Sequence, residues 1–462
     1  MKSDLDTLFE WVKRQLQTEG GILRYVVQGA STIIVIQIAS FALRYVTQIG
    51  LARWMGASQY GEYVFGLSIA TILAIPAAMG LPTAVLRFVP QYIQNEKWAF
   101  LKGIIYRSWQ IILAAGGLIF AIAFGVIHGL EAHGWVQNVP VVLLGAALTP
   151  FLAAQNLQLQ LTRASEYMVL AYAPSYLLRH FLVLACAAVL AFRATGSLSS
   201  TTMLIVTGGV LMAVSMGQLL LWLRKLPDGY RAERPAYKTQ KWLVVAWPLL
   251  LVAGFNVLLG QSDLFLLGVF RPSEDVGVYN VALKSSVVVT FLLTGVNAVA
   301  APRISKLYGS NEIDQLQKLV TLVAHLSFWP SIFFAIGLVV FREPYLWLFG
   351  ADFLRADVAM IILILGKLTS AAAGSVAYLL NLTGRQAISS RVFAWSAIIN
   401  IALNLVLIPY FGIEGAAVAS TVTTILWNVW LHIHVSQEIG VTASVFRFPD
   451  VSAILQSDVR DG

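Results

Sequence analysis

Seven ionisable side chains stand inside long apolar stretches of the sequence, and four of the five formal charges among them are positive. They are Arg44, Arg179, Asp263, Lys284 and Lys367, with His180 and His325. An ionised side chain at the centre of a membrane span costs at least about 3 kcal/mol on insertion scales. Such groups are therefore expected to face a wet cavity or a partner, and their sign points to an anionic cargo.

Polar side chains recur at helical spacing on three of these stretches. They are Gln37, Ser40, Arg44 and Gln48 on the first, Tyr172, Tyr176, Arg179 and His180 on the fifth, and Asn280 and Lys284 on the eighth. Residues three or four apart lie on one face of a helix. These faces are predicted to line a polar, cationic cavity, and Lys367, which has no acidic neighbour in its own stretch, joins this substrate-binding set.

Structural roles compete with this interpretation at each charge. Lys284 and Asp263 lie in consecutive stretches and could form a buried ion pair that only fixes packing. Arg44 and Arg179 could instead extend to a membrane surface. His180 and His325 are more often packing residues than proton carriers. Asp263 is the candidate for coupling transport to an ion.

Composition places these charges in a membrane protein. Hydrophobic residues make up 58% of the 462 residues and charged residues only 12%, against about 25% charged in soluble domains. About twelve stretches are long enough to cross a bilayer as helices, which takes roughly 20 residues. They are 26–50, 61–80, 103–127, 139–160, 168–192 and 201–222 in the first half, and 242–268, 279–300, 319–341, 358–380, 392–408 and 415–434 in the second.

The loops alternate in charge. Arg87, Lys97, Lys102 and Arg107 fall on the side of the N-terminus, whereas the segment 128–138 has no Lys or Arg. The positive-inside rule therefore predicts that both termini are cytoplasmic. It also accounts for the net charge of +8, because the basic residues are spread over short loops rather than gathered on a face that would bind nucleic acid.

The expected organisation is an all-α bundle of two six-helix lobes. The predicted parts are an amphipathic segment at 1–24, lying on the membrane or against cytoplasmic loops, a first lobe at 25–224, a basic linker at 225–241, a second lobe at 242–436 and a cytoplasmic tail at 437–462. The linker could attract anionic lipid headgroups. The single cysteine, Cys186, allows no intramolecular disulfide and no metal or redox motif, and no metal or cofactor is expected.

An internal repeat relates the two halves. With one constant offset, Gly61 matches Gly277, Arg87 matches Arg303, Tyr92 matches Tyr308, and LRFVPQYIQNEKWAFLK aligns with PRISKLYGSNEIDQLQK. Each half holds an even number of spans, so the halves are parallel repeats about an axis along the membrane normal. Transporters of this kind place their substrate site between the lobes, around a central cavity.

Three segments carry a family resemblance. LARWMGASQYGEYVFGLS (51–68) and GLPTAVLRFVPQYI (80–93) resemble signatures of the polysaccharide-transporter, or oligosaccharide flippase, family. NIALNLVLIPYFGIEGAAVAS (400–420) resembles a signature shared across the superfamily of multidrug extruders, lipid II flippases and polysaccharide flippases. The resemblance implies flipping of an undecaprenyl-pyrophosphate-linked oligosaccharide across a bacterial inner membrane, for surface polysaccharide synthesis together with a polymerase and assembly proteins.

Two other functions compete with this expectation. A multidrug exporter would need a membrane-embedded carboxylate, for which Asp263 is the candidate. A membrane enzyme acting on lipid-linked sugar would need a large catalytic loop with paired acids or a nucleophile, and the loops are too short for one. The chain is therefore expected not to be an enzyme.

Overall fold

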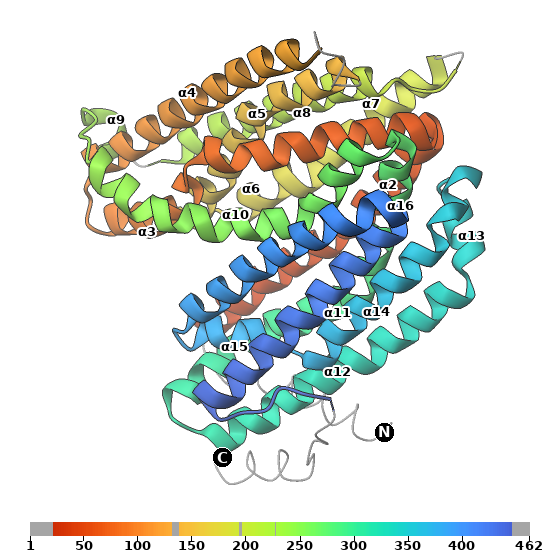
Figure 1. The fold of residues 1–462 in the computed structure, drawn as a ribbon. Coiled ribbons are helices and arrows are strands. Elements are labelled where there is room, and N and C mark those ends of the chain that lie inside the picture. The colour runs from red at the N-terminus through yellow and green to blue at the C-terminus, as the bar shows by residue number, and fades with distance from the viewer. Residues whose placement is uncertain (1–21, 132–137, 194–195, 227, 446–462) are drawn as a thin grey trace.

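The computed structural model describes residues 22–131, 138–193, 196–226 and 228–445, and every regular element in these ranges is a helix (Figure 1). The helices are α2 (Ile22–Ala78), α3 (Leu81–Gln94), α4 (Trp98–Glu131), α5 (Val139–Ala164), α6 (Met168–Tyr172), η1 (Ala173–Leu178), α7 (Arg179–Arg193), α8 (Ser200–Lys225), α9 (Asp228–Ala232), α10 (Thr239–Phe270), α11 (Ser273–Gly309), α12 (Ile313–Val340), α13 (Arg342–Trp347), η2 (Ala351–Ala356), α14 (Asp357–Ala373), α15 (Val376–Leu382) and α16 (Gln386–Ile439). The predicted all-α membrane fold is confirmed.

The number of spans depends on how the long helices are counted. Among the described residues, nine helices are long and apolar enough to cross a membrane, and the bent α11 makes ten. Two of these helices contain a glycine in a non-helical conformation, Gly56 (φ 71°) in α2 and Gly412 (φ 58°) in α16. Each is therefore two helices joined at a kink, and a total of twelve spans is consistent with the structure.

The hydrophobic core divides into three clusters. The largest draws on both halves, from Leu51 in α2 to Ala417 in α16. A second joins α3, α4, α5 and the start of α10, and a third joins the end of α11 with α12, α15 and the end of α16. In Figure 1 the two groups of helices accordingly converge toward α13 and diverge toward α3 and α15. The molecule is thus closed at one end.

Backbone contact between the halves makes this closed end. A Cβ built on Gly61 would lie 1.7 Å from the carbonyl oxygen of Ser273, and one on Gly277 would lie 2.5 Å from that of Ala57. Gly61 and Gly277 are the matched positions of the repeat, and they face each other where the two helices cross. Small residues allow helix backbones to approach this closely.

Beyond this crossing, the constant offset that relates the two halves in the sequence no longer holds in the structure. The left-handed turn residue is Glu96 (φ 52°) after α3 but Asn311 (φ 60°) after α11, so the offset there is one residue shorter. In this interval the first half has a helix break at Met79 and Gly80, whereas α11 bends by 43°. The two halves therefore differ in this interval both in length and in the continuity of the helix.

The first helix of each half packs against the opposite half. In α2, Phe41 packs on Phe291 of α11 with ring centroids 4.4 Å apart. In α10, the indole of Trp242 donates a 3.0 Å hydrogen bond to the Tyr92 hydroxyl. The predicted residue bounds of the lobes stay a prediction, and the packing groups the start of α10 with the first half.

The two chain ends lie largely outside the described residues. The predicted amphipathic segment at 1–24 is described only from Ile22 onward, and the predicted tail at 437–462 only as far as 445. Within the tail, the backbone N–H and carbonyl of Thr442 both bond the side-chain amide of Gln317 on α12. The first residues after α16 therefore pack against the second half.

The close backbone contact at Gly61 predicts that one added methyl group destabilises the fold at this position but not at an open glycine. Gly61→Ala should lower the free energy of unfolding by about 1–3 kcal/mol, the usual penalty for overpacking, because its Cβ meets backbone rather than a flexible side chain. Gly209→Ala on α8 is the matched control, since a Cβ there meets nothing within 4 Å. Thermal unfolding in detergent measures both variants. Equal stability of the two would contradict the crossing.

Candidate functional site

Three adjoining cavities lie between the two groups of helices. The central one, of about 310 Å³, is lined by α2, α5, η1, α7, α8, α10 and α11. It shares Arg44 and Tyr176 with a cavity of about 370 Å³, and Tyr176 and Arg179 with one of about 450 Å³. Among the described residues that line the three cavities, none is acidic. We call this set of cavities the central cavity.

The predicted polar face of α2 lines this cavity. Gln48 lines the cavity of about 310 Å³, Gln37 lines the adjoining cavity of about 370 Å³, and Arg44 lines both. The Nε of Arg44 is buried and has no hydrogen-bond partner among the described residues. A buried donor without an acceptor is costly, so the described part of the chain leaves the Arg44 guanidinium only partly compensated.

Arg179 enters the cavity from the end of a π-helical turn. The turn η1 contains Pro174, and one-turn π-helices inside α-helices are frequent at functional sites. Arg179 donates a 2.9 Å hydrogen bond from Nη1 to the side-chain oxygen of Gln155, and its Nη2 lies 3.2 Å from Nε2 of His180. Neutral groups therefore hold the guanidinium in place and leave its charge uncompensated.

The second half contributes Lys284 and Asn280 from α11. Both line the central cavity, and the Asn280 amide donates a 2.8 Å hydrogen bond to the Tyr60 hydroxyl of α2. The backbone carbonyl of Lys284 accepts a hydrogen bond from the Tyr45 hydroxyl. The Lys284 ammonium, by contrast, has no hydrogen-bond partner among the described residues, and it lies within electrostatic range of Arg44 and Lys367.

Asp263 is not among the residues that line the central cavity. Its carboxylate accepts hydrogen bonds from the Asn404 amide at 2.6 Å, from the Tyr279 hydroxyl at 2.7 Å and from the Ser420 hydroxyl. These neutral groups, rather than Lys284, are its partners in the described part of the chain, so the alternative of a Lys284–Asp263 ion pair is wrong. Lys367 is likewise absent from the cavity lining but lies within electrostatic range of Asp263.

Several lining residues were missing from the predicted set. Tyr60, Tyr63 and Gln261 line the central cavity, and Gln155 and Asn156 line its extension. The run QNLQLQ at 155–160 inside a predicted span is the signal that could have identified the last two. The tyrosines give no such signal, because aromatic residues are common in the core of any bundle.

The arrangement suits binding rather than bond-making. Arginine and lysine side chains compensate the desolvation of a phosphate, and arginine can bind it with two parallel hydrogen bonds. Amides and tyrosine rings around them offer hydrogen bonds and flat apolar faces to an uncharged polar group. Among the described residues, no group of three or more His, Cys, Asp or Glu side chains could hold a metal ion.

Known proteins resemble the chain in sequence and in fold. The probable low-salt glycan biosynthesis flippase Agl15 of Haloferax volcanii is 24% identical over 408 residues, which cover 87% of this chain and 81% of that protein. An inward-facing transporter of the multidrug resistance MATE family superposes with a TM-score of 0.69 at 13% identity, over 87% of this chain and 94% of that one. The lipid II flippase MurJ superposes with a TM-score of 0.65 at 16% identity, over 87% of each chain.

Two family models also match the sequence. The MatE family matches residues 248–406. The family described as Polysaccharide biosynthesis protein matches residues 26–308, more than half of the chain. Both agree with the superfamily to which the sequence signatures pointed. The chain is therefore a multi-pass membrane protein that belongs to the polysaccharide biosynthesis protein family.

Proposed function

We propose that the chain is a flippase that moves a lipid-linked oligosaccharide across the membrane. The observation that carries this proposal is the central cavity, which is lined by Arg44, Arg179 and Lys284 and by no acidic residue among those described. A phosphate-bearing head would compensate charges that have no acidic partner among the described residues. The relatives named as a glycan biosynthesis flippase and a lipid II flippase support the same class of cargo.

The proposal also names the carrier lipid, the membrane and the pathway. Undecaprenyl pyrophosphate in a bacterial inner membrane is the carrier and location that the sequence resemblance implies. On the predicted sidedness, the diverging end of the bundle, where α9 and the basic linker lie, faces the cytoplasm. The cargo would then enter from the cytoplasmic leaflet and leave when the Gly61–Gly277 end opens. A polysaccharide polymerase and assembly proteins would act after export.

A cation-coupled multidrug exporter is the second candidate. The observation in its favour is Asp263, a carboxylate buried in the membrane region. Its hydrogen bonds to Tyr279, Asn404 and Ser420 hold it inside the second half, away from the cations that line the cavity. Such a position suits an ion that drives transport better than a cationic drug, and we assign Asp263 to coupling.

The substrate-binding role of the cations predicts the outcome of charge removal. Arg44→Ala or Lys284→Ala should slow flipping of undecaprenyl-pyrophosphate-linked oligosaccharide in proteoliposomes by about ten- to hundredfold, the value of one hydrogen bond to a charged group. Arg44→Lys and Lys284→Arg, which keep the charge, should retain more activity. Arg391→Ala, at an exposed arginine of α16, is the control. Unchanged flipping in both alanine variants would refute this site.

Asp263 predicts a change in energy coupling. In wild-type proteoliposomes, an imposed ion gradient or membrane potential should accelerate flipping. Asp263→Asn removes the negative charge but keeps hydrogen-bonding atoms, so flipping should persist without responding to the gradient. Asp314→Asn, at an exposed acid of α12, should respond as the wild type does. Wild-type flipping that ignores both driving forces would contradict secondary coupling.

A further inference from the structure

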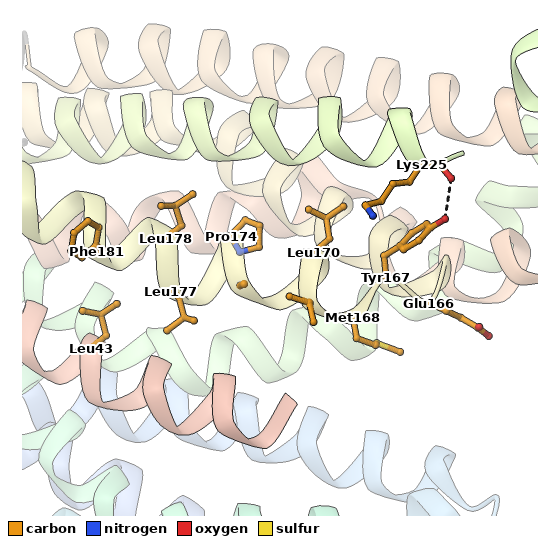
Figure 2. A pocket seen from close by; sticks show the side chains of 12 residues that line it. Leu43, Glu166, Tyr167, Met168, Leu170, Pro174, Leu177, Leu178, Phe181 and Lys225 are labelled. Carbon is orange, nitrogen blue, oxygen red and sulfur yellow. Dashed lines mark hydrogen bonds between the residues drawn. The ribbon is translucent and has the colours of Figure 1, made fainter. Parts of the chain in front are cut away.

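An apolar groove of about 840 Å³ runs along α6, η1 and α7, separate from the central cavity (Figure 2). Its walls carry leucine, valine, methionine, phenylalanine and proline side chains, and polar groups are confined to one end. In Figure 2 Lys225, Tyr167 and Glu166 stand at that end, and Phe181 and Leu43 at the other. With about 1.5 Å of rise per residue, the helix between Tyr167 and Phe181 gives the groove a length of roughly 20 Å.

The groove and the central cavity share a wall that is one helix thick. On η1, Pro174 and Leu177 line the groove, whereas Tyr176 lines the cavity. On α2, Leu43 lines the groove, whereas its neighbour Arg44 lines the cavity. The same two segments thus present an apolar surface to the outside and a cationic surface to the inside.

A cation marks the polar end of the groove. The Lys225 ammonium lies 5.4 Å from the centre of the Tyr167 ring, and the Tyr167 hydroxyl donates a 2.9 Å hydrogen bond to the Lys225 carbonyl. Lys225 is exposed and ends α8 at the start of the basic linker. The Glu166 side chain points away from Lys225 in Figure 2. The end of the groove therefore offers a positive charge at the level of the loops.

We propose that this groove holds the isoprenoid tail of the lipid-linked substrate, with the substrate's phosphate at Lys225, before the head enters the central cavity. The inference rests on the proposed function, since it concerns the same cargo. A single tail attached to a phosphate matches one apolar groove that ends at one cation. Because the groove and the cavity lie on two sides of the same helices, the head would move past the end of this wall from Lys225 toward Arg44 and Arg179 while the tail stays outside the cavity.

Photo-cross-linking in the full-length chain tests the tail site. A benzophenone-bearing residue replaces Phe181 in the groove or Val189, which is 52% exposed on the same helix and is not among the groove's lining residues. Each protein is placed in vesicles of phosphatidylethanolamine and phosphatidylglycerol with radiolabelled undecaprenyl pyrophosphate. Labelling should be stronger at position 181 than at 189. With labelled phosphatidylglycerol as the probe, the two positions should be labelled alike.

Substitution of Lys225 tests the phosphate end. Lys225→Gln should lower labelling at position 181 by undecaprenyl pyrophosphate about fivefold, the effect of one lysine near an anionic group at a membrane surface. Labelling by undecaprenol, which lacks the phosphate, should not change. Lys225→Arg should restore labelling, and the neighbouring Arg224→Gln should leave it unchanged. An equal loss with undecaprenol would show a purely structural role for Lys225 and overturn the proposal.

The readouts separate this inference from the proposed function. Equal labelling at positions 181 and 189 would mean that the groove holds ordinary membrane lipid, and it would refute the tail site even if flipping is normal. Preferential labelling in a wild-type chain that does not flip the substrate would refute the proposed function and leave the tail site intact. Arg44→Ala should slow flipping about ten- to hundredfold without changing the labelling, because Arg44 lies on the cavity side of the shared wall.

Discussion

The contact between Gly61 and Gly277 sets the geometry on which the rest of the structure depends. Two helices from different halves cross there backbone to backbone, with a space too small for any side chain. One hydrophobic core spans both halves around this crossing, while each half keeps a core of its own toward the opposite end. In transporters built from two such repeats, the halves rock against each other. The cavity lies where they begin to diverge, so its access depends on the angle at the crossing.

The charges in that cavity are a second constraint. Positive groups inside a membrane protein are expensive unless water or an opposite charge compensates them. Here the acid that could have done so, Asp263, is satisfied by neutral hydrogen-bond donors in another part of the second half. The cations instead gain partial compensation from amides, as Arg179 does from Gln155. Among the described residues that line the cavity, no acid supplies the opposite charge, and on the proposed function the phosphate of the cargo supplies it.

The sequence predicted much of this because membrane insertion limits the solutions. Apolar length and helical spacing identified the helices and the polar face from Gln37 to Gln48, and the repeat identified the glycines that meet at the crossing. Two features could not be predicted in this way. Asp263 and Lys284 are close in the chain, but they point into different surroundings because the rotation of each helix is set by packing. The helical register of η1 also depends on a π-turn, which periodicity alone does not reveal.

The π-turn η1 also contributes residues both to the central cavity and to the apolar groove. A regular α-helix through Pro174 would lack one backbone hydrogen bond, and the π-turn changes the direction of the residues that follow it. Tyr176 and Arg179 then face inward, and Leu177, Leu178 and Phe181 face the groove. An amphiphilic cargo needs both surfaces at once, since its head cannot enter hydrocarbon and its tail gains nothing from a polar cavity. For the cargo that we propose, one irregular helix would separate the two surfaces, and the cavity would not need to admit the tail.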